Sequence, residues 1–539
     1  MAAESRSSDS APRNVDMEKG LHPNTSDLEG ATIRTESAPG SPDIREDAEK
    51  DAEQNPDIVD WDGPDDPGNP QNWPMKMKWM NVATISMLTF VTRPLGSSMF
   101  APGIPKIMVE FGETSPTVAT FVVSVYILGF AFGPLIIAPM SEVFGRARLY
   151  IWGNILFTIF TVGVALSQNM AMMMAFRFLM GLAGAVPITI GSGSIADIMP
   201  VELRGRAMSA WALGPLLGPC IGPVAGGYLI KAAGWRWVYW LVTIVGGIFI
   251  PLSWFMMKET FAPLILERKA ERLRKETGNR NLRSKLQTEA KISDTFRHAI
   301  VRPLKLLFLT PIVTLMALYV AITYGILYLL ITTFSFVYKD QYGFDEGTIG
   351  LTFLPAGIGM MIGVVTFGML TDFIVIRNKA KGLTHRPEAR LTPVLTMPCG
   401  VVLPIGLFIY GWTAEKGVHF IVPMLGVVIF SIGLMGVMVS PNALKIPRIS
   451  SLTWREKMCV QNYLLDTYPR YAASVTAALA VLRSLAGALL PLGGLEMYNA
   501  LGLGWGNSLL GFISVGLIPI PLVFFLFGER IRSKFKPSL

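Results

Sequence analysis

Long hydrophobic runs alternate with short polar segments over most of the chain. A helix needs about 20 mostly apolar residues to cross the hydrocarbon core of a bilayer, which is about 30 Å thick. Twelve runs of suitable length follow one another and predict twelve transmembrane helices: Trp79–Ala101, Thr117–Met140, Leu149–Ser167, Met170–Ile195, Ala207–Leu229, Val238–Met256, Leu306–Phe336, Thr348–Leu370, Leu391–Trp412, Phe420–Ser440, Ala472–Gly494 and Trp505–Phe527.

These runs form two groups of six, separated by a long polar segment. The pattern predicts an all-α membrane protein with a six-helix bundle in residues 73–256 and a second bundle in residues 306–528. Between them we expect a basic cytoplasmic loop, residues 257–305, and after them a short basic tail, residues 529–539.

The chain begins with a segment of a different kind. Residues 1–66 contain 18 acidic and 6 basic residues and are rich in Ser and Pro. Such a segment cannot bury enough apolar area to order itself, so residues 1–72 are predicted to be a disordered acidic tail. The tail lacks the basic start and apolar core of a signal peptide, which favours a cytoplasmic location.

Composition agrees with a membrane protein and excludes several other classes. Hydrophobic residues make up 51% of the chain and charged residues 16%, whereas soluble proteins carry about 25% charged residues. This excludes an ordinary cytosolic enzyme and a nucleic-acid-binding protein, and three cysteines are too few for a disulfide scaffold.

The distribution of Lys and Arg predicts the orientation. If the N-terminus lies inside, the five inner loops hold 27 Lys and Arg residues and the six outer loops hold 5. Because cytoplasmic loops carry the excess of positive charge, both termini are predicted to be cytoplasmic.

The two halves repeat features at corresponding positions. Gly133 precedes Glu142 by nine residues, as Gly363 precedes Asp372. The Asp197-Ile-Met-Pro sequence after the fourth run is matched by Asp466-Thr-Tyr-Pro after the tenth. Repeated halves of this kind are typical of transporters that bind substrate between two bundles near the middle of the membrane.

Three motifs resemble the major facilitator superfamily. They are the loop motif from Gly133 through Glu142 to Arg148, the Arg177-Phe-Leu-Met-Gly181 sequence, and the Gly- and Pro-rich motif of the fifth run, which is similar to that of antiporters. The segment Trp61–Trp73 and the segment Gln461–Asp466 further resemble fungal twelve-span drug:proton antiporters.

The resemblance implies a function and its partners. We expect a plasma-membrane transporter that uses the proton gradient to export lipophilic small molecules, such as fungal secondary metabolites, toxins or drugs, by alternating access. It would be monomeric, would act within the lipid bilayer without cofactor or metal, and would bind no nucleic acid.

The fifth-run motif suggests a moving helix. Its members are Gly214, Pro215, Gly218, Pro219, Gly222, Gly226 and Gly227. Glycines four residues apart share one helix face, which lets a neighbouring helix approach closely, and prolines remove backbone hydrogen bonds. The resemblance favours a gating role, although small residues also simply improve packing.

Arg177 is the strongest single candidate for proton coupling. A guanidinium within a membrane span costs at least about 2.5–3.5 kcal/mol, so a functional role is the default, with snorkelling to the outer surface as the alternative. The other coupling and gating candidates lie at the inner helix ends: Glu142, Arg146, Asp197, Asp372 and Asp466. Asp197 and Asp466 are the candidates for carrying the proton.

A second set of residues is predicted to line the substrate cavity. Arg93 and Arg483 also lie within predicted spans, and no Asp or Glu lies at the same depth. Unpaired guanidiniums in a partly desolvated cavity repel ammonium groups, so neutral or weakly acidic substrates are expected. The aromatic and sulfur-containing candidates are Met99, Phe100, Tyr126, Tyr324, Tyr328, Phe353 and Tyr463.

Other functions are compatible with the same sequence features. A polyamine or other cation exporter on the same fold is the main one. A membrane sensor would be expected to carry a structured signalling tail, and a membrane enzyme would need a metal or nucleophile motif, which the sequence lacks.

The segment Ser440–Val460 departs from the family pattern. It is polar and contains Pro441 and Pro447, whereas the family continues almost directly from the tenth span into the Gln461–Asp466 stretch. It is either a retained intron or a longer inner loop.

Overall fold

The computed structural model describes residues 57–286, 292–380, 391, 393–438, 463–464, 467–468 and 471–535. The described residues of the first half form η1 (Pro70–Asn72), α2 (Met75–Phe90), the π-helical turn η2 (Val91–Leu95), α3 (Gly96–Ser98), η3 (Ala101–Gly103), α4 (Ile104–Phe111), α5 (Pro116–Phe144), α6 (Arg146–Ala165), α7 (Met170–Gly184), α8 (Val186–Ile198), α9 (Val201–Ala233) and α10 (Arg236–Met256).

The remaining elements follow in the same order. They are α11 (Ala262–Thr277), α12 (Ile292–Leu309), α13 (Pro311–Tyr342), α14 (Glu346–Leu351), α15 (Leu354–Ala380), α16 (Pro393–Glu415), α17 (Ile421–Met438), α19 (Ala472–Leu489), η8 (Leu490–Gly493), α20 (Gly494–Leu517) and α21 (Pro519–Lys534). A two-residue strand pair, β1 (Ile58–Val59) and β2 (Arg283–Ser284), is the only sheet among the described residues.

The twelve predicted spans are confirmed by these helices. Eight helical runs are long and apolar enough to cross a membrane, and the last of them, Ser474–Lys534, holds two spans. The other three spans are α2 to α3, α9 and α17. Ile421–Val437 of α17 is apolar but shorter than the eight helical runs.

Local sequence explains where several spans begin. Proline is tolerated in the first turn of a helix, and Pro116 and Pro311 occupy the first positions of α5 and α13. The side chain of Asn169 caps α7 by accepting a hydrogen bond from the amide of Met172, at 2.8 Å.

The internal repeat predicted from Gly133 and Gly363 appears as equivalent helix packing. An ideal Cβ on Gly133 would lie 2.4 Å from Cβ of Ala185, just after α7 in the fourth span. An ideal Cβ on Gly363 would lie 2.8 Å from the carbonyl oxygen of Ile432 in α17, the tenth span. The second span therefore packs on the fourth as the eighth packs on the tenth, which is the pseudo-symmetry expected of repeated halves.

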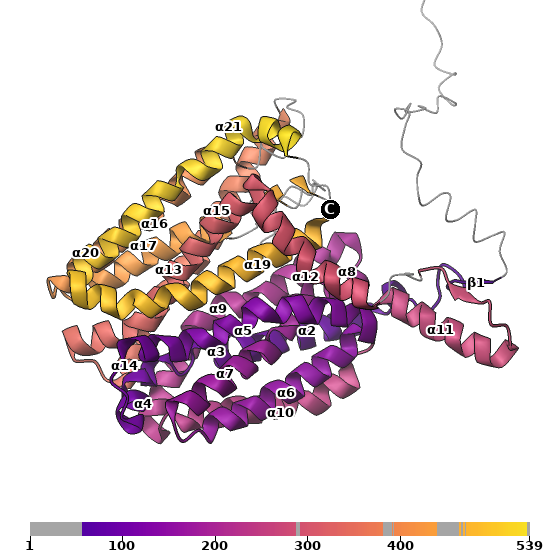
Figure 1. The fold of residues 1–539 in the computed structure, drawn as a ribbon, viewed down its shortest axis with the longest axis horizontal. Coiled ribbons are helices and arrows are strands. Elements are labelled where there is room, and N and C mark those ends of the chain that lie inside the picture. Colours follow the sequence, from indigo (N-terminus) through magenta and orange to yellow (C-terminus); the bar gives the residue numbers. More distant parts are fainter. Residues whose placement is uncertain are drawn as a thin grey trace, which may run out of the picture. The chain divides into compact units, whose positions relative to one another are not determined.

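The two bundles contact each other along two pairs of helices. α5 of the first half lies beside α19 of the second, as the indigo and yellow ribbons show (Figure 1), and α9 lies against α14 and α15. In the equivalence of the two halves, α5 corresponds to α15 and α9 corresponds to α19. The interface therefore pairs each of these spans with a non-equivalent span of the other bundle.

The prediction of disorder through residue 72 is corrected for its final part. β1 pairs in parallel with β2, which comes after α11 in the central loop. Lys269 of α11 donates hydrogen bonds to the carbonyl oxygen of Asp60, at 2.9 Å, and to the carboxylate of Asp62, at 2.5 Å. The acidic residues just before the first span are ordered because the basic central loop supplies their partners.

Several predicted features lie outside the described residues. These are the tail up to residue 56, the whole Ser440–Val460 segment, and the Gln461, Asn462 and Asp466 positions. Asp372 belongs to α15, but its side chain is also outside the description.

Candidate functional site

The ends of the spans form two faces of the membrane domain. The amino-terminal face carries β1, the turn between α5 and α6, and α11, whereas the opposite face carries α4, the turn between α9 and α10, and α14. Alternate spans begin and end at these two faces, as the chain order requires.

A polar cluster joins the two bundles within the membrane region. Arg93 of the first span donates a hydrogen bond from Nη2 to the hydroxyl of Tyr324 in α13, at 2.8 Å. The guanidinium carbon of Arg483, in α19, lies 5.0 Å from the centre of the Tyr324 ring. Two cations that are 390 residues apart in the sequence therefore meet around one phenol.

The backbone positions this cluster. Pro94 has no amide hydrogen, so the carbonyl four residues earlier loses its regular partner, and the first span widens into the π-helical turn η2 that holds Arg93. An ideal Cβ on Gly487 would lie 3.1 Å from the Tyr324 ring, so a small residue in α19 makes room for the phenol. Tyr328 lies one turn along α13, with its ring 4.9 Å from that of Tyr324.

The hydrogen bonds of the cluster leave positive charge uncompensated. Nε of Arg483 is buried and has no hydrogen-bond partner within the described structure. Arg93 and Arg483 are each partly exposed, whereas Tyr324 and Tyr328 are buried. We call Arg93, Tyr324, Tyr328 and Arg483 the central cluster.

Arg177 has a different environment from the central cluster. It is completely buried, and it donates from Nε to the carbonyl of Val122 at 2.6 Å and from Nη1 to the hydroxyl of Tyr239 at 2.7 Å. Its Nη2 group lies 3.2 Å from the carbonyl oxygen of Ser97. The guanidinium also stacks on Phe100, 3.8 Å from the ring centre.

These contacts make Arg177 a connector of four spans. Its partners belong to the first, second and sixth spans, and its own helix is the fourth. The expectation that all three membrane arginines present unpaired charge to the cavity is therefore corrected for Arg177, because backbone carbonyls already satisfy its guanidinium.

Several predicted cavity residues pack within a bundle. Phe100 covers Arg177, and the hydroxyl of Tyr126 donates to the carbonyl of Thr92. Phe353 packs edge-on against Phe334, with ring centres 5.4 Å apart. Met99 and Tyr463 are buried as well, and substrate contact by these residues stays a prediction.

A second polar group lies at the amino-terminal face. Arg146 forms an ion pair with Asp197 at 2.9 Å, so two residues predicted from different motifs meet. Glu142 is exposed on the last turn of α5, and Arg148 is exposed on the first turn of α6.

The sequence analysis missed Glu259 in this group. Its Oε1 atom accepts hydrogen bonds from the amides of Arg146, at 2.9 Å, and Phe261, at 3.1 Å. Gly145, which has φ of 90°, precedes α6, and a Cβ there would lie 2.2 Å from Glu259. A carboxylate at the start of a helix satisfies free amides, and the sequence signal was an acidic residue just after the sixth span.

The fifth-span motif forms part of the contact between the bundles. An ideal Cβ on Gly227 would lie 2.4 Å from the carbonyl oxygen of Glu346 in α14, and one on Gly350 would lie 2.5 Å from the carbonyl oxygen of Pro223. Gly226 instead faces Met99 of the first half, where a Cβ would lie 1.7 Å from the carbonyl oxygen. Gly214, which four-residue spacing places on the same face as Gly226, also lies against the first span, where a Cβ would be 3.4 Å from Phe90, whereas Gly227 contacts the second bundle.

Hydrogen bonds and an ion pair join the two bundles at the opposite face. Lys231 at the end of α9 pairs with Asp345 before α14, at 2.5 Å. Thr117 donates to Glu496 at 2.5 Å, and Ser335 donates to the carbonyl of Ala101 at 2.8 Å. Hydrogen bonding from Lys231 and Thr348 holds the pKa of Asp345 well below its usual range.

Comparison with known proteins identifies the family. A sequence profile described as Major Facilitator Superfamily matches residues 86–491, which is most of the chain. The chain belongs to the major facilitator superfamily.

Fungal members of the superfamily are similar over nearly the full length. The efflux pump radE of Floropilus chiversii is 50% identical over 90% of this chain and 86% of its own. The MFS-type transporter penM of Penicillium rubens is 47% identical over 92% of this chain and 93% of its own.

Solved structures share the fold at much lower identity. A bacterial homolog of the human lysosomal transporter Spinster, in an inward-facing conformation, has a TM-score of 0.58 and 13% identity, covering 86% of this chain and all of its own. This major facilitator protein is therefore a multi-pass membrane transporter of small molecules, and it is not an enzyme and needs no cofactor.

Proposed function

We propose that this transporter exports lipophilic neutral or weakly acidic small molecules in exchange for protons, by alternating access. The observation that carries the proposal is the central cluster. It places Arg93 and Arg483, from different bundles, around Tyr324 inside the membrane region. A substrate bound there would contact both bundles, which alternating access requires.

The charge of the cluster supports the substrate class. Guanidiniums attract carbonyl, phenolate and carboxylate oxygens and repel ammonium groups, and Nε of Arg483 has no hydrogen-bond partner within the described structure. The predicted spans carry no Asp or Glu at this depth that could bind a cation. Tyrosine rings 4.9 Å apart add an aromatic wall suited to flat lipophilic compounds.

The contacts at the two faces support alternating access. Lys231–Asp345 and Thr117–Glu496 join the bundles at the opposite face. We infer that substrate reaches the central cluster from the amino-terminal face in this conformation, and that these ties break when it leaves at the opposite face. The excess of Lys and Arg in loops of the amino-terminal face favours its placement in the cytoplasm, with both termini.

Proton coupling is proposed to use residues on both sides of the central cluster. The Arg146–Asp197 pair joins the third and fourth spans at the amino-terminal face, and a charge pair of this kind can reform differently in the other conformation. Arg177 remains the coupling candidate that the family resemblance suggests, with Glu142, Asp372 and Asp466 as further candidates. We further propose a monomer in the plasma membrane.

Reconstitution in proteoliposomes tests the proposal. With an imposed pH gradient, the wild-type chain is expected to accumulate a phenolic or neutral lipophilic toxin, and a protonophore should abolish the accumulation. Spermine and a quaternary ammonium ion serve as matched cationic substrates. Gradient-driven transport of the cations alone would overturn the substrate class and favour a cation exporter. Accumulation that survives the protonophore would overturn proton exchange.

A further inference from the structure

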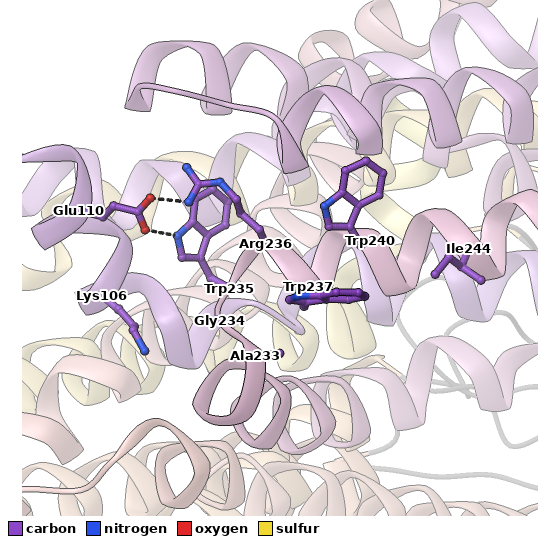
Figure 2. A pocket seen from close by; sticks show the side chains of 9 residues that line it. All are labelled: Lys106, Glu110, Ala233, Gly234, Trp235, Arg236, Trp237, Trp240 and Ile244. Atoms are coloured by element: carbon purple, nitrogen blue, oxygen red, sulfur yellow. Dashed lines mark hydrogen bonds and ion pairs between the residues drawn. The ribbon is translucent and has the colours of Figure 1, made fainter.

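A hollow at the opposite face lies apart from the contact between the bundles. It has a volume of about 520 Å³ and lies between α4 and the first turns of α10 (Figure 2). Lys106 and Glu110 of α4 lie at one end, and Trp237, Trp240 and Ile244 lie along α10. Because α10 enters the membrane here, the hollow lies where lipid headgroups meet the protein.

Three side chains form a fixed polar wall. Glu110 accepts a hydrogen bond from Nε1 of Trp235 at 2.7 Å and forms an ion pair with Arg236 (Figure 2). Arg236 also donates to the carbonyl of Ser167 at 3.2 Å and lies over the Trp235 ring, 4.3 Å from its centre. Partial burial raises the pKa of Glu110, but the Trp235 and Arg236 hydrogen bonds outweigh this and lower it, so the carboxylate stays ionised.

Lys106 is the charged residue of the hollow that has no ion-pair partner among the described residues. It is exposed and forms no ion pair or hydrogen bond with any described residue, whereas Glu110 is already occupied by Trp235 and Arg236. Two cations and one carboxylate leave a net charge of one positive unit facing the hollow. That charge suits a single anionic group such as a phosphate.

The apolar side of the hollow continues along the lipid-facing surface of α10. Trp237 and Ile244 are more than half exposed, and Ile248, one turn further, is 61% exposed. Tryptophan side chains are favoured at the membrane–water boundary because they have a large apolar body and one polar N–H group. A ligand with an anionic head and an apolar tail would match both ends.

We propose that this hollow binds the headgroup of an anionic phospholipid. Its phosphate would contact the ammonium group of Lys106 beside the fixed Arg236, and one acyl chain would lie along Trp237 and Ile244. The net positive charge predicts preference for an anionic headgroup over a zwitterionic one. The site would bind lipid independently of the transport cycle, since its lining residues come only from the first bundle.

Lipid binding to the purified full-length protein tests the proposal. Phosphatidylglycerol or phosphatidylcholine is added to delipidated protein, and bound lipids are counted by native mass spectrometry. We expect one phosphatidylglycerol to be retained most tightly, with Lys106→Glu weakening its binding about tenfold, equal to about 1.4 kcal/mol. Lys416→Glu, which makes the same charge change at another exposed position of this face, should have no such effect.

A second measurement locates the lipid without relying on charge. A lipid with brominated acyl chains should quench tryptophan fluorescence, and the quenching should fall in a Trp237→Phe, Trp240→Phe double variant. Equal loss of lipid in the Lys106 and Lys416 variants would show general surface electrostatics only and would overturn the site. Displacement of phosphatidylglycerol by inorganic phosphate would show a site for free anions, and unchanged quenching in the double variant would also contradict the proposal.

Discussion

At the scale of single residues, the three arginines of the membrane region differ in their partners. Arg177 is saturated by carbonyl groups and one phenol within the first bundle, whereas Arg93 has one phenol partner across the bundles. Nε of Arg483 has no partner within the described structure. The contacts of Arg177 therefore join spans within the first bundle, whereas Arg93 and Arg483 lie where the two bundles meet.

For Arg177 we expect a loss of both stability and transport. Replacing Tyr239 by Phe removes one hydrogen bond to the charged group and should cost about 1.5–3 kcal/mol of stability. Arg177→Ala removes all the hydrogen bonds by which this side chain joins four spans and should cost more stability. Arg177→Lys should restore only part of the stability and transport, because an ammonium group cannot form the planar fork of a guanidinium.

Thermal unfolding in detergent and gradient-driven efflux measure the two effects. If Arg177→Ala unfolds at the wild-type temperature but loses proton dependence, Arg177 acts in coupling and the structural role is wrong. Full stability together with full efflux would remove Arg177 from both roles.

For the central cluster we expect a change in substrate preference. Arg93→Gln and Arg483→Gln keep a polar side chain but remove charge, so affinity for acidic substrates should fall about tenfold, equal to about 1.4 kcal/mol, with less effect on neutral ones. Competition binding with paired acidic and neutral analogues measures the ratio. An equal loss for both analogues would indicate damage to the cavity rather than loss of a charge contact.

At the scale of elements, α9 of the first bundle contacts both its own bundle and the second one. Cys220, Pro223 and Gly227 recur along the surface that contacts the eighth span, where their neighbours are Gly357, Gly350 and Glu346. Backbones approach closely because one partner in each contact is small. The proposed alternating access would separate these contacts, and close packing without large side chains suits an interface that opens and closes.

A bulky residue at Gly227 should prevent this interface from closing. Gly227→Leu would place its Cβ 2.4 Å from the Glu346 carbonyl oxygen, and overpacking of this kind costs about 1–3 kcal/mol. We expect efflux to fall and the opposite face to open. Gly247→Leu in α10 is the matched control, because nothing lies within 4 Å of its Cβ position.

The native Cys220 reports on this opening. It is buried beside Gly357, so a water-soluble thiol reagent should label it only when α9 and α15 separate. With the other two cysteines of the chain, Cys399 and Cys459, replaced by Ser, the Gly227 variant should label faster than the Gly247 variant. Equal labelling would show that the two spans do not separate as proposed.

At the scale of the whole transporter, the Lys231–Asp345 pair links the two bundles at the opposite face. Both side chains are substantially exposed, so water and salt weaken the pair. Asp345→Asn should therefore raise the opening equilibrium only about two- to fivefold, measured as faster Cys220 labelling. An increase far beyond this range would show that the pair is the main lock.

The pH dependence of this pair has a definite sign. The pKa of Asp345 is lowered by hydrogen bonding from Lys231 and Thr348, so its contribution is complete above the ordinary aspartate pKa of about 3.9. That contribution is lost only as pH falls through the lowered value. Relative to the labelling of a free thiol at the same pH, which corrects for the thiolate fraction, Cys220 labelling should therefore stay constant from pH 8 to about pH 5. Acceleration that begins near pH 6 and disappears in Asp345→Asn would contradict the assignment.

Hydrophobic run length and charge distribution were sufficient to predict the twelve spans and the two bundles. These properties are local, because each span must satisfy its own length and polarity against the lipid. Motif residues that are close in sequence were also recognised, such as Gly133 with Glu142 and Arg146. Gly363 and Asp372 have the same nine-residue spacing in the second half, and this spacing predicted the internal repeat.

Contacts between distant segments could not be predicted in the same way. The sequence placed Arg93, Arg177 and Arg483 within predicted spans and singled out Arg177 by its motif, but the energy of each charge depends on which carbonyls and hydroxyls the packed helices bring near. Glu259 was missed because one of its partner amides, that of Arg146, lies 113 residues away in the sequence. Which charges remain free for a ligand is thus a property of helix packing, whereas span number and order follow from hydropathy along the chain.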